Sequence, residues 1–127
     1  MTKVALDSTE VAIAAARAAA DKSATDIVVL DVSEVLVITD LFVICTADNP
    51  RQLKTVIEAI QERIREMGER PARREGEPDA GWWLLDYIDV VVHVFAPEQR
   101  MYYDLERLWR DAPKVEWEPP ARAATGG

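Results

Sequence analysis

Two closely spaced runs of β-branched and aromatic residues constrain the fold of this chain more than any other feature. They are "TDIVVLDVS" at residues 25–33 and "VLVITDLFVICTA" at residues 35–47. In both runs the apolar residues are nearly continuous and do not alternate with polar ones. Short strands with this pattern are usually covered on both faces. The sequence therefore predicts two interior strands of a sheet that is covered on each side.

Two predicted helices flank these strands. The first begins after Asp7, a capping residue, has Glu10 at its third position and runs to about residue 21. The second follows Asn49 and Pro50, a typical cap and first-turn residue, and ends at Gly68. Apolar residues recur along it at helical spacing, namely Leu53, Val56, Ile57, Ile60, Ile64 and Met67.

The stretch "GWWLLDYIDVVVHVF" at residues 81–95 predicts a β-hairpin in which residues 82–87 pair with residues 88–95. Successive residues of a strand point to opposite faces of the sheet. Trp82 and Trp83 therefore cannot both enter the same core, and one of the two rings needs another partner.

The remaining segments complete the predicted order αββα(β)ββα. A turn-rich segment precedes the hairpin and has room for a short edge strand at residues 72–75. A last helix begins near Pro97 and stops before Pro113. Its apolar stripe contains Met101, Leu105 and Leu108, with Tyr102 and Trp109 beside it. We expect an α/β fold with a single mixed sheet flanked by helices, formed by residues 1–113, and a disordered tail at residues 114–127.

Charge and cysteine content limit the partners and the compartment. The net charge of −8 disfavours a protein that binds nucleic acid by neutralising phosphates, so we expect little direct nucleic-acid contact. An acidic surface serves either simple solubility or encounter with a basic partner. The single cysteine, Cys45, lies in an apolar run and is typical of a core residue in a reducing compartment. No signal peptide and no membrane span is evident, which predicts a cytoplasmic protein without membrane contact.

Residues with catalytic or ligand chemistry are few. The only histidine, His93, lies within a predicted strand, where we expect a hydrogen bond to hold it in place. One histidine and one buried cysteine match no zinc spacing, and none of the five glycines forms a phosphate-binding motif. We therefore expect no metal and no cofactor. Carboxylates do stand at strand ends, where turn and cap roles are commoner than Mg²⁺ binding; they are Asp26, Asp31, Asp40, Asp86 and Asp89.

Three blocks of the chain resemble the bacterial ribosomal silencing factors, the Iojap-related proteins. They are "LDVSEVLVITDLFVICTA", "EGEPDAGWWLLDYIDVVVHVF" and "RMYYDLERLW". The resemblance implies a nucleotidyltransferase-like fold without known catalysis. It also implies a translation inhibitor that binds the large ribosomal subunit through its basic L-fourteen-type protein. Such an inhibitor obstructs joining of the small subunit when nutrients are scarce.

The resemblance further implies a contact surface on the hairpin. Trp82 and Tyr87 match the family's contact positions, and the partner-binding residues it implies are Trp82, Leu84, Asp86, Tyr87 and Ile88. Trp83 and Leu85 then face the core. A different role for Trp82 is packing under the last helix or against a second copy of the chain. Ile88 stands where the family often has glycine.

An alternative function is that of a magnesium-dependent nucleotidyltransferase-like enzyme that uses Asp31, Asp40 or Asp86. The chain lacks the Gly-Ser pair followed by Asp-x-Asp with which such enzymes hold the metal and the triphosphate. We therefore expect no catalytic residues. An apolar hairpin surface also predicts that the free chain forms a homodimer, because such patches seldom stay uncovered.

Overall fold

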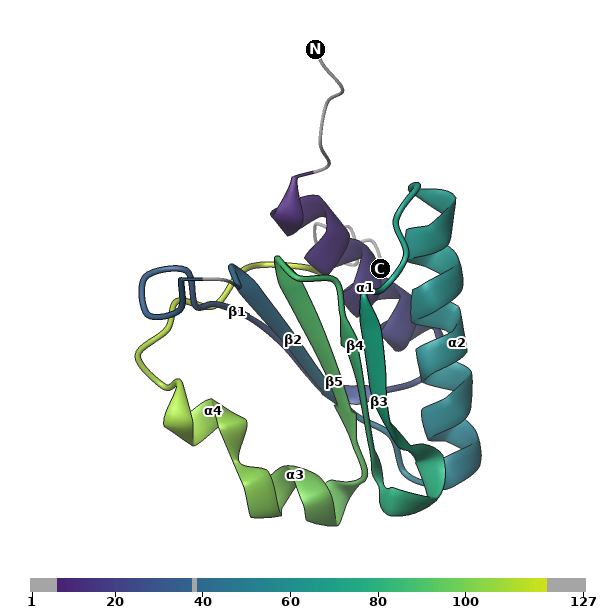
Figure 1. Ribbon diagram of the computed structural model, residues 1–127. Coiled ribbons are helices and arrows are strands. Elements are labelled where there is room, and N and C mark those ends of the chain that lie inside the picture. The colour runs from purple at the N-terminus through teal and green to yellow at the C-terminus, as the bar shows by residue number, and fades with distance from the viewer. Residues whose placement is uncertain (1–6, 38, 119–127) are drawn as a thin grey trace, which may run out of the picture.

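A five-stranded mixed sheet forms the centre of the fold (Figure 1). The computed structural model describes residues 7–37 and 39–118. In chain order the elements are α1 (Ser8–Asp21), β1 (Thr25–Asp31), β2 (Leu41–Thr46), α2 (Pro50–Glu66), β3 (Arg73–Glu77), a 3-10 turn (Pro78–Ala80), β4 (Trp82–Asp86), β5 (Val90–Phe95), α3 (Pro97–Tyr103) and α4 (Leu105–Leu108). The predicted α/β class, with one mixed sheet flanked by helices, is confirmed.

The strands are arranged in the order β1-β2-β5-β4-β3. The central pair, β2 and β5, is parallel, with Leu41 opposite Val90 and Thr46 opposite Phe95. All other neighbours are antiparallel. Because β2 and β5 start at the same edge, the hairpin turn between β4 and β5 lies beside the residues that lead into β2. Backbone hydrogen bonds join the two, since the amides of Asp40 and Leu41 donate to the carbonyl of Asp89.

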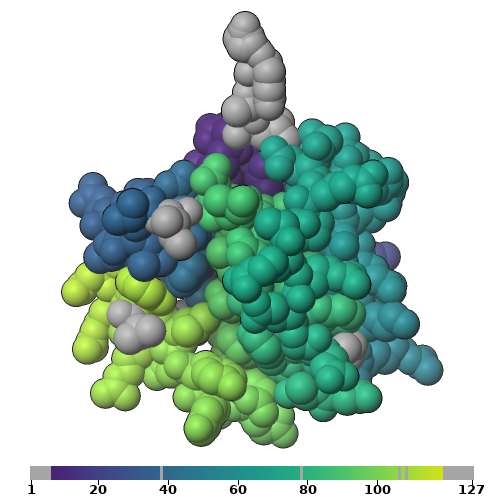
Figure 2. All heavy atoms as spheres, viewed as in Figure 1, coloured from purple at the N-terminus to yellow at the C-terminus, as the bar shows by residue number. Residues whose placement is uncertain are grey.

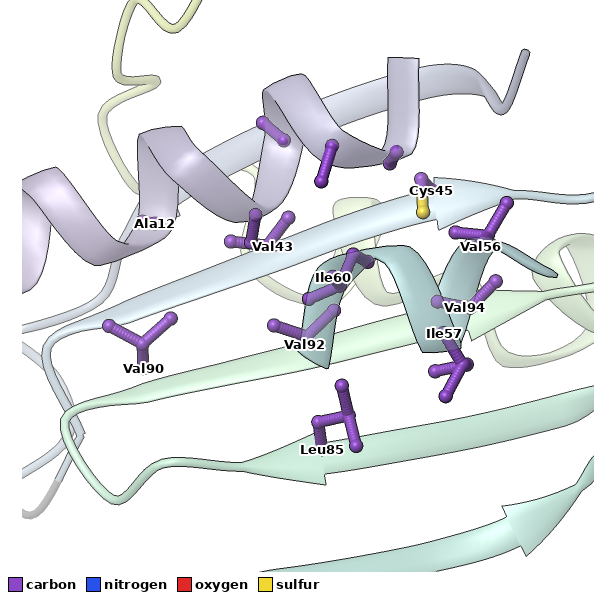
Figure 3. Packing of buried hydrophobic residues seen from close by; sticks show 14 of the residues in the cluster. Ala12, Val43, Cys45, Val56, Ile57, Ile60, Leu85, Val90, Val92 and Val94 are labelled. Carbon is purple, nitrogen blue, oxygen red and sulfur yellow. The ribbon is translucent and has the colours of Figure 1, made fainter. Parts of the chain in front are cut away.

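Helices α1 and α2 cover one face of the sheet and enclose the larger core cluster (Figure 3). The predicted caps of both helices are present, because Asp7 accepts a hydrogen bond from the amide of Thr9 and Asn49 accepts one from Gln52. The predicted apolar stripe of α2 is buried from Leu53 to Ile64. The sheet residues of the same core cluster include Val43, Cys45, Leu85, Val92 and Val94, all fully buried.

The opposite face of the sheet has a second, smaller cluster of buried residues. Its buried members are Leu30, Val32, Ile44 and Phe95. Leu105 and Trp109, from α4 and the residue after it, pack against this cluster. In Figure 1, α3 and α4 lie away from α1 and α2, with α3 beside the end of β5 and α4 further toward β1. Both faces of β1 and β2 are therefore covered, as their sequences predicted.

Two predicted strand features are wrong. The second strand begins at Leu41 and not at residue 35, because the chain turns after Val32, where the amide of Leu36 donates to the Val32 carbonyl. The apolar residues of this turn, Val35 and Val37, point to solvent. The first strand, β1, is also an edge strand of the sheet and not an interior one.

The predicted last helix is divided into α3 and α4. Asp104, between them, has a φ of 47°, in the left-handed region that a helix interior does not allow. Because of this break, the apolar residues of α3 and α4 no longer lie on one face of a single helix. Met101, predicted to be on the apolar side, is 81% exposed, whereas Leu105 packs against the sheet.

The C-terminal segment departs from the predicted tail. Residues 114–118 lie against β1, and Leu30 pairs with Lys114. The expectation of disorder is therefore wrong for these residues, and residues 119–127 lie outside the described part of the chain. Among the described helices none is long and apolar enough to cross a membrane.

Candidate partner-binding surface

The β4–β5 hairpin directs alternate side chains to the two faces of the sheet. Trp83 lies opposite Val94 and Leu85 opposite Val92, so both face the larger core beneath α1 and α2. Leu85 is fully buried. Trp83 is half-buried, and the guanidinium carbon of Arg74 lies 5.6 Å from the centre of its ring. The predicted orientation of Trp83 and Leu85 toward the core is confirmed.

Trp82, Leu84 and Asp86 project from the opposite face, and all three are half-buried. Trp82 lies opposite Phe95 and packs against the second cluster. Part of its ring is therefore covered within the chain. This agrees in part with the other predicted role of Trp82, which was packing under the last helix. The rest of the ring remains available to a partner.

An open strip of sheet extends from this part of β4 onto β3. Glu75 pairs with Leu84 and Glu77 pairs with Trp82, so these carboxylates border the apolar side chains on the same face. Figure 2 shows β3 (teal) and the hairpin (green) in view together, with α3 and α4 (yellow-green) beside them. We name the surface formed by Trp82, Leu84, Asp86, Glu75 and Glu77 the open strip. The two β3 carboxylates were missed because their register with β4 is set by the fold, although the alternating "EGE" was a signal of an edge strand.

Tyr87 does not belong to the open strip. It is only 9% exposed, lies in the larger core cluster, and has a buried hydroxyl without a hydrogen-bond partner. Burial raises the pKa of this hydroxyl to about 12, and the nearby Glu69 carboxylate adds to the rise. The expectation that Tyr87 lies on an exposed contact surface is wrong for the described fold, because odd-numbered residues of the strand point to the core.

Ile88, at the tip of the hairpin, is 59% exposed and has a φ of 73°. A β-branched residue is strained in this left-handed region. The Asp86 carboxylate holds the turn by accepting a hydrogen bond of 2.7 Å from the Ile88 amide. The tip therefore presents an exposed apolar side chain where the resemblance leads one to expect glycine.

The strand-end aspartates serve local structure. Asp31 accepts hydrogen bonds from the amide and hydroxyl of Ser33, which lower its pKa. Asp40 accepts a hydrogen bond from the Ser8 hydroxyl at 3.3 Å. Asp86 lies 3.3 Å from the Arg73 guanidinium. In the part of the chain that the structure describes, no group of three or more histidine, cysteine or acidic residues could hold a metal ion.

His93 and Cys45 are packed residues. The ring of His93 stacks on Phe95, meets the edge of Phe42, and has both nitrogens buried without a hydrogen-bond partner. The expected hydrogen bond to this side chain is therefore absent, and burial lowers its pKa to about 4. Burial also raises the pKa of the Cys45 thiol to about 12, as befits the predicted core residue.

Comparison with known proteins identifies the family. The sequence profile described as "Ribosomal silencing factor during starvation" matches residues 5–126. The chain belongs to the ribosomal silencing factor family. It is 41% identical over 102 residues to the Bacillus subtilis ribosomal silencing factor RsfS, covering 80% of this chain and 86% of that protein. It is 39% identical over 108 residues to the chloroplastic Iojap protein of Zea mays, covering 83% of this chain and 46% of the longer maize protein.

Solved structures agree with this assignment to the ribosomal silencing factors. A crystal structure of a Chromobacterium violaceum protein superposes with a TM-score of 0.79 at 32% identity, covering 92% of this chain and 97% of that one. A crystal structure of a Bacillus halodurans protein superposes with a TM-score of 0.73 at 36% identity, covering 84% of this chain and 97% of that one. This silencing factor is thus a ribosome-associated regulator of translation during starvation and not an enzyme.

Proposed function

We propose that this silencing factor binds the large ribosomal subunit through its L-fourteen-type protein and thereby blocks joining of the small subunit. The observation that carries the proposal is the open strip, where the apolar side chains of Trp82 and Leu84 lie beside the carboxylates of Glu75 and Glu77. Ile88 extends the apolar part at the hairpin tip. Half-buried aromatic side chains with polar surroundings are typical of binding hot spots.

The charge of the chain supports a basic partner. The net charge is −8, and the open strip contributes three carboxylates, of which Glu75 and Asp86 both pair with the Arg73 guanidinium, at 2.7 and 3.3 Å. A basic ribosomal protein would be attracted over distances of about a Debye length, roughly 8–10 Å at ordinary salt. The same charge opposes close approach to exposed RNA phosphates. Protein contact on the subunit is therefore favoured over direct RNA contact.

Inhibition by this mechanism requires only affinity and position. An interface of standard size buries roughly 800 Å² on each partner, which a domain of 14.3 kDa can supply. A domain held there occupies space that the incoming small subunit needs. No group of the chain has to change its protonation state or form a covalent bond.

The test is cosedimentation of the purified chain with isolated large subunits, with small subunits as control, followed by a subunit-joining assay. We expect enrichment with large subunits only and fewer joined ribosomes. Replacing Trp82 with alanine should weaken binding by about 2 kcal/mol, some thirtyfold in Kd, because the exposed part of the ring is lost from the interface. Equal pelleting with both subunits, or none, would contradict the proposal.

Trp83→Ala is the matched control, since it removes the same side chain from the other face of β4. It should lower the free energy of unfolding by about 3 kcal/mol as a large-to-small core substitution. Binding of the fraction that remains folded should be unchanged. Trp82→Ala should cost less stability, because its ring packs only against the smaller cluster. If the folded Trp83→Ala chain loses binding while Trp82→Ala retains it, the interface lies on the opposite face.

In the absence of the subunit, the open strip also favours a homodimer. Apolar surface around Trp82 and Ile88 would be removed from water by a second copy. Light scattering of the free chain should then show a mass above that of a monomer, and Trp82→Ala should reduce it. A monomer mass at all concentrations would contradict this part of the proposal.

A further inference from the structure

The outer edge of β1 is covered by the chain's own C-terminal segment, residues 113–118. The amide of Asp31 donates to the carbonyl of Pro113 at 2.8 Å, and the amide of Val115 donates to the carbonyl of Val29 at 2.8 Å. Leu30 and Lys114 are antiparallel bridge partners. We call residues 113–118 the cover strand.

Trp117 anchors the cover strand. Its indole N–H donates to the carbonyl of Ile27 at 3.2 Å, and its own carbonyl accepts a hydrogen bond of 2.8 Å from the Arg17 side chain of α1. The side chains of Val115 and Trp117 pack against the larger core cluster, whereas Lys114 and Glu116 are exposed. The cover strand therefore has one apolar face directed to the core and one polar face directed to solvent.

Beneath the cover strand, β1 has the properties of an edge that pairs readily. Residues 27–30 are Ile-Val-Val-Leu, so both faces of the strand are apolar. A bulge between Thr25 and Val28, with Asp26 at a φ of 49°, interrupts only the first residues of the strand. Natural proteins protect such edges with charges, bulges or covering segments. At Val29 the protection comes from the covering segment, because the bulge lies earlier in the strand.

We propose that the cover strand keeps the β1 edge from pairing with β1 of a second copy of this chain. On release of residues 113–118, two β1 strands pair antiparallel about a two-fold axis. The carbonyl of Val29 and the amide of Asp31, both bonded to the cover strand in the intact chain, then bond across that axis. Both apolar layers of the sheet continue from one copy into the next, which is why a second copy is the fitting occupant.

The test disrupts the cover strand in the full chain by Val115→Pro together with Trp117→Ala. The proline removes the N–H that bonds Val29, and the alanine removes the indole that bonds Ile27. Glu116→Ala, an exposed position of the same segment, is the matched control. At a concentration low enough for the intact chain to be a monomer, light scattering should show that the mass of the double variant is twice that of the intact chain. Glu116→Ala should have the mass of the intact chain.

A peptide of residues 111–118 separates β1 pairing from association through the open strip. Added to the double variant, it should restore the mass of the intact chain by reoccupying the edge. The same peptide with both substitutions should have no effect. A folded double variant with the mass of the intact chain would overturn the proposal, as would doubling that the peptide does not reverse.

Hydrogen exchange on the intact chain provides a second measurement if the double variant fails to fold. Release of the cover strand predicts that the amides of Asp31 and Val115 exchange together through a local opening, faster than the amides of β2 and β5. Exchange of these two amides only through global unfolding would overturn the proposal.

Discussion

At the scale of single residues, His93 is the titratable side chain with the most buried polar atoms that lack a hydrogen-bond partner in the described part of the chain. Both ring nitrogens are buried without a partner, between Phe42 and Phe95. A buried donor or acceptor without a hydrogen bond costs about 1–3 kcal/mol. The ring compensates through its aromatic contacts, and its burial makes the protonated form much less favourable than the neutral one.

This burial predicts that stability falls as the pH is lowered. The pKa of His93 is about 4 in the folded chain against an ordinary value of 6.5. Between these values the unfolded chain binds a proton that the folded chain does not. The contribution is therefore fully present above pH 6.5 and is lost as the pH falls toward 4, by about 3 kcal/mol in all. Urea unfolding as a function of pH measures it.

His93→Phe is the control for this prediction. The change keeps a flat ring between Phe42 and Phe95 but removes the titrating nitrogens. We expect a more stable chain whose pH dependence between 6.5 and 4 is flatter than that of the parent. Identical slopes for the two chains would show that His93 does not titrate differently in the folded and unfolded states.

Ile88 predicts opposite effects on stability and binding. Its φ of 73° costs about 1–3 kcal/mol for a β-branched residue, which glycine avoids at an entropic cost of about 0.5–1 kcal/mol. Ile88→Gly should therefore stabilise the fold by about 1 kcal/mol, measured by urea unfolding. The lost apolar contact should weaken binding to large subunits by about 1 kcal/mol, roughly fivefold. Ile88→Asn should have the same two effects, since asparagine tolerates the turn and also lacks the apolar side chain. A loss of stability in both variants would disprove the strain.

At the scale of elements, helices with local signals were predictable and those that depend on tertiary contacts were not. The cap at Asn49 and the regular apolar spacing specify α2 within the sequence itself. The segment after Pro97 has a comparable spacing, but Asp104 adopts a left-handed conformation that breaks it into α3 and α4. Which of Met101 and Leu105 meets the sheet is decided by that break and not by periodicity.

In the β4–β5 hairpin, too, some features were predictable from the local sequence and others depend on tertiary contacts. Alternation along β4 predicted that Trp82 and Trp83 lie on opposite faces, and the resemblance supplied the assignment of Trp83 and Leu85 to the core, which the structure has. Alternation also assigns Tyr87 to the core, against the position that the resemblance implied. The sequence signals an edge strand at β3, but not its register with β4, which brings Glu75 beside Leu84 and depends on a contact between segments. The open strip was thus predictable on one strand only.

The β3–β4 pair depends on Gly76. Its φ is 88°, and a Cβ atom there would overlap the carbonyl oxygen of Trp82 and lie 2.8 Å from Cε3 of its ring. Gly76→Ala should lower the free energy of unfolding by about 2 kcal/mol or more, from backbone strain plus this overlap. Gly68→Ala is the matched control, because Gly68 has a φ of 96° but nothing within 4 Å of the added atom. It should lose only the strain contribution, about 1 kcal/mol; equal losses in urea unfolding would show that the close approach to Trp82 has no energetic effect.

At the scale of the whole molecule, the two faces of the sheet have different tasks. The α1–α2 face contains most of the buried residues and supplies most of the stability. On the opposite face, α3 packs against β5, and Leu105 and Trp109 pack against the second cluster, which leaves β4 and β3 to form the open strip. A rigid face therefore supports an accessible one, and the carboxylates of β3 are fixed in position relative to Trp82.

This arrangement predicts that the position of the negative charge matters more for binding than its total. Glu75→Lys with Glu77→Lys, and Glu58→Lys with Glu66→Lys on the outer side of α2, change the net charge of −8 by the same amount. The β3 pair should lower the association rate with large subunits about tenfold at low salt, because it reverses the field at the interface itself. The α2 pair should lower it by much less. The difference should diminish as added salt shortens the screening length, which stopped-flow tryptophan fluorescence can follow. Equal effects of the two pairs would mean that only the overall charge steers association. That result would contradict the proposal that the open strip is the surface that binds the basic partner.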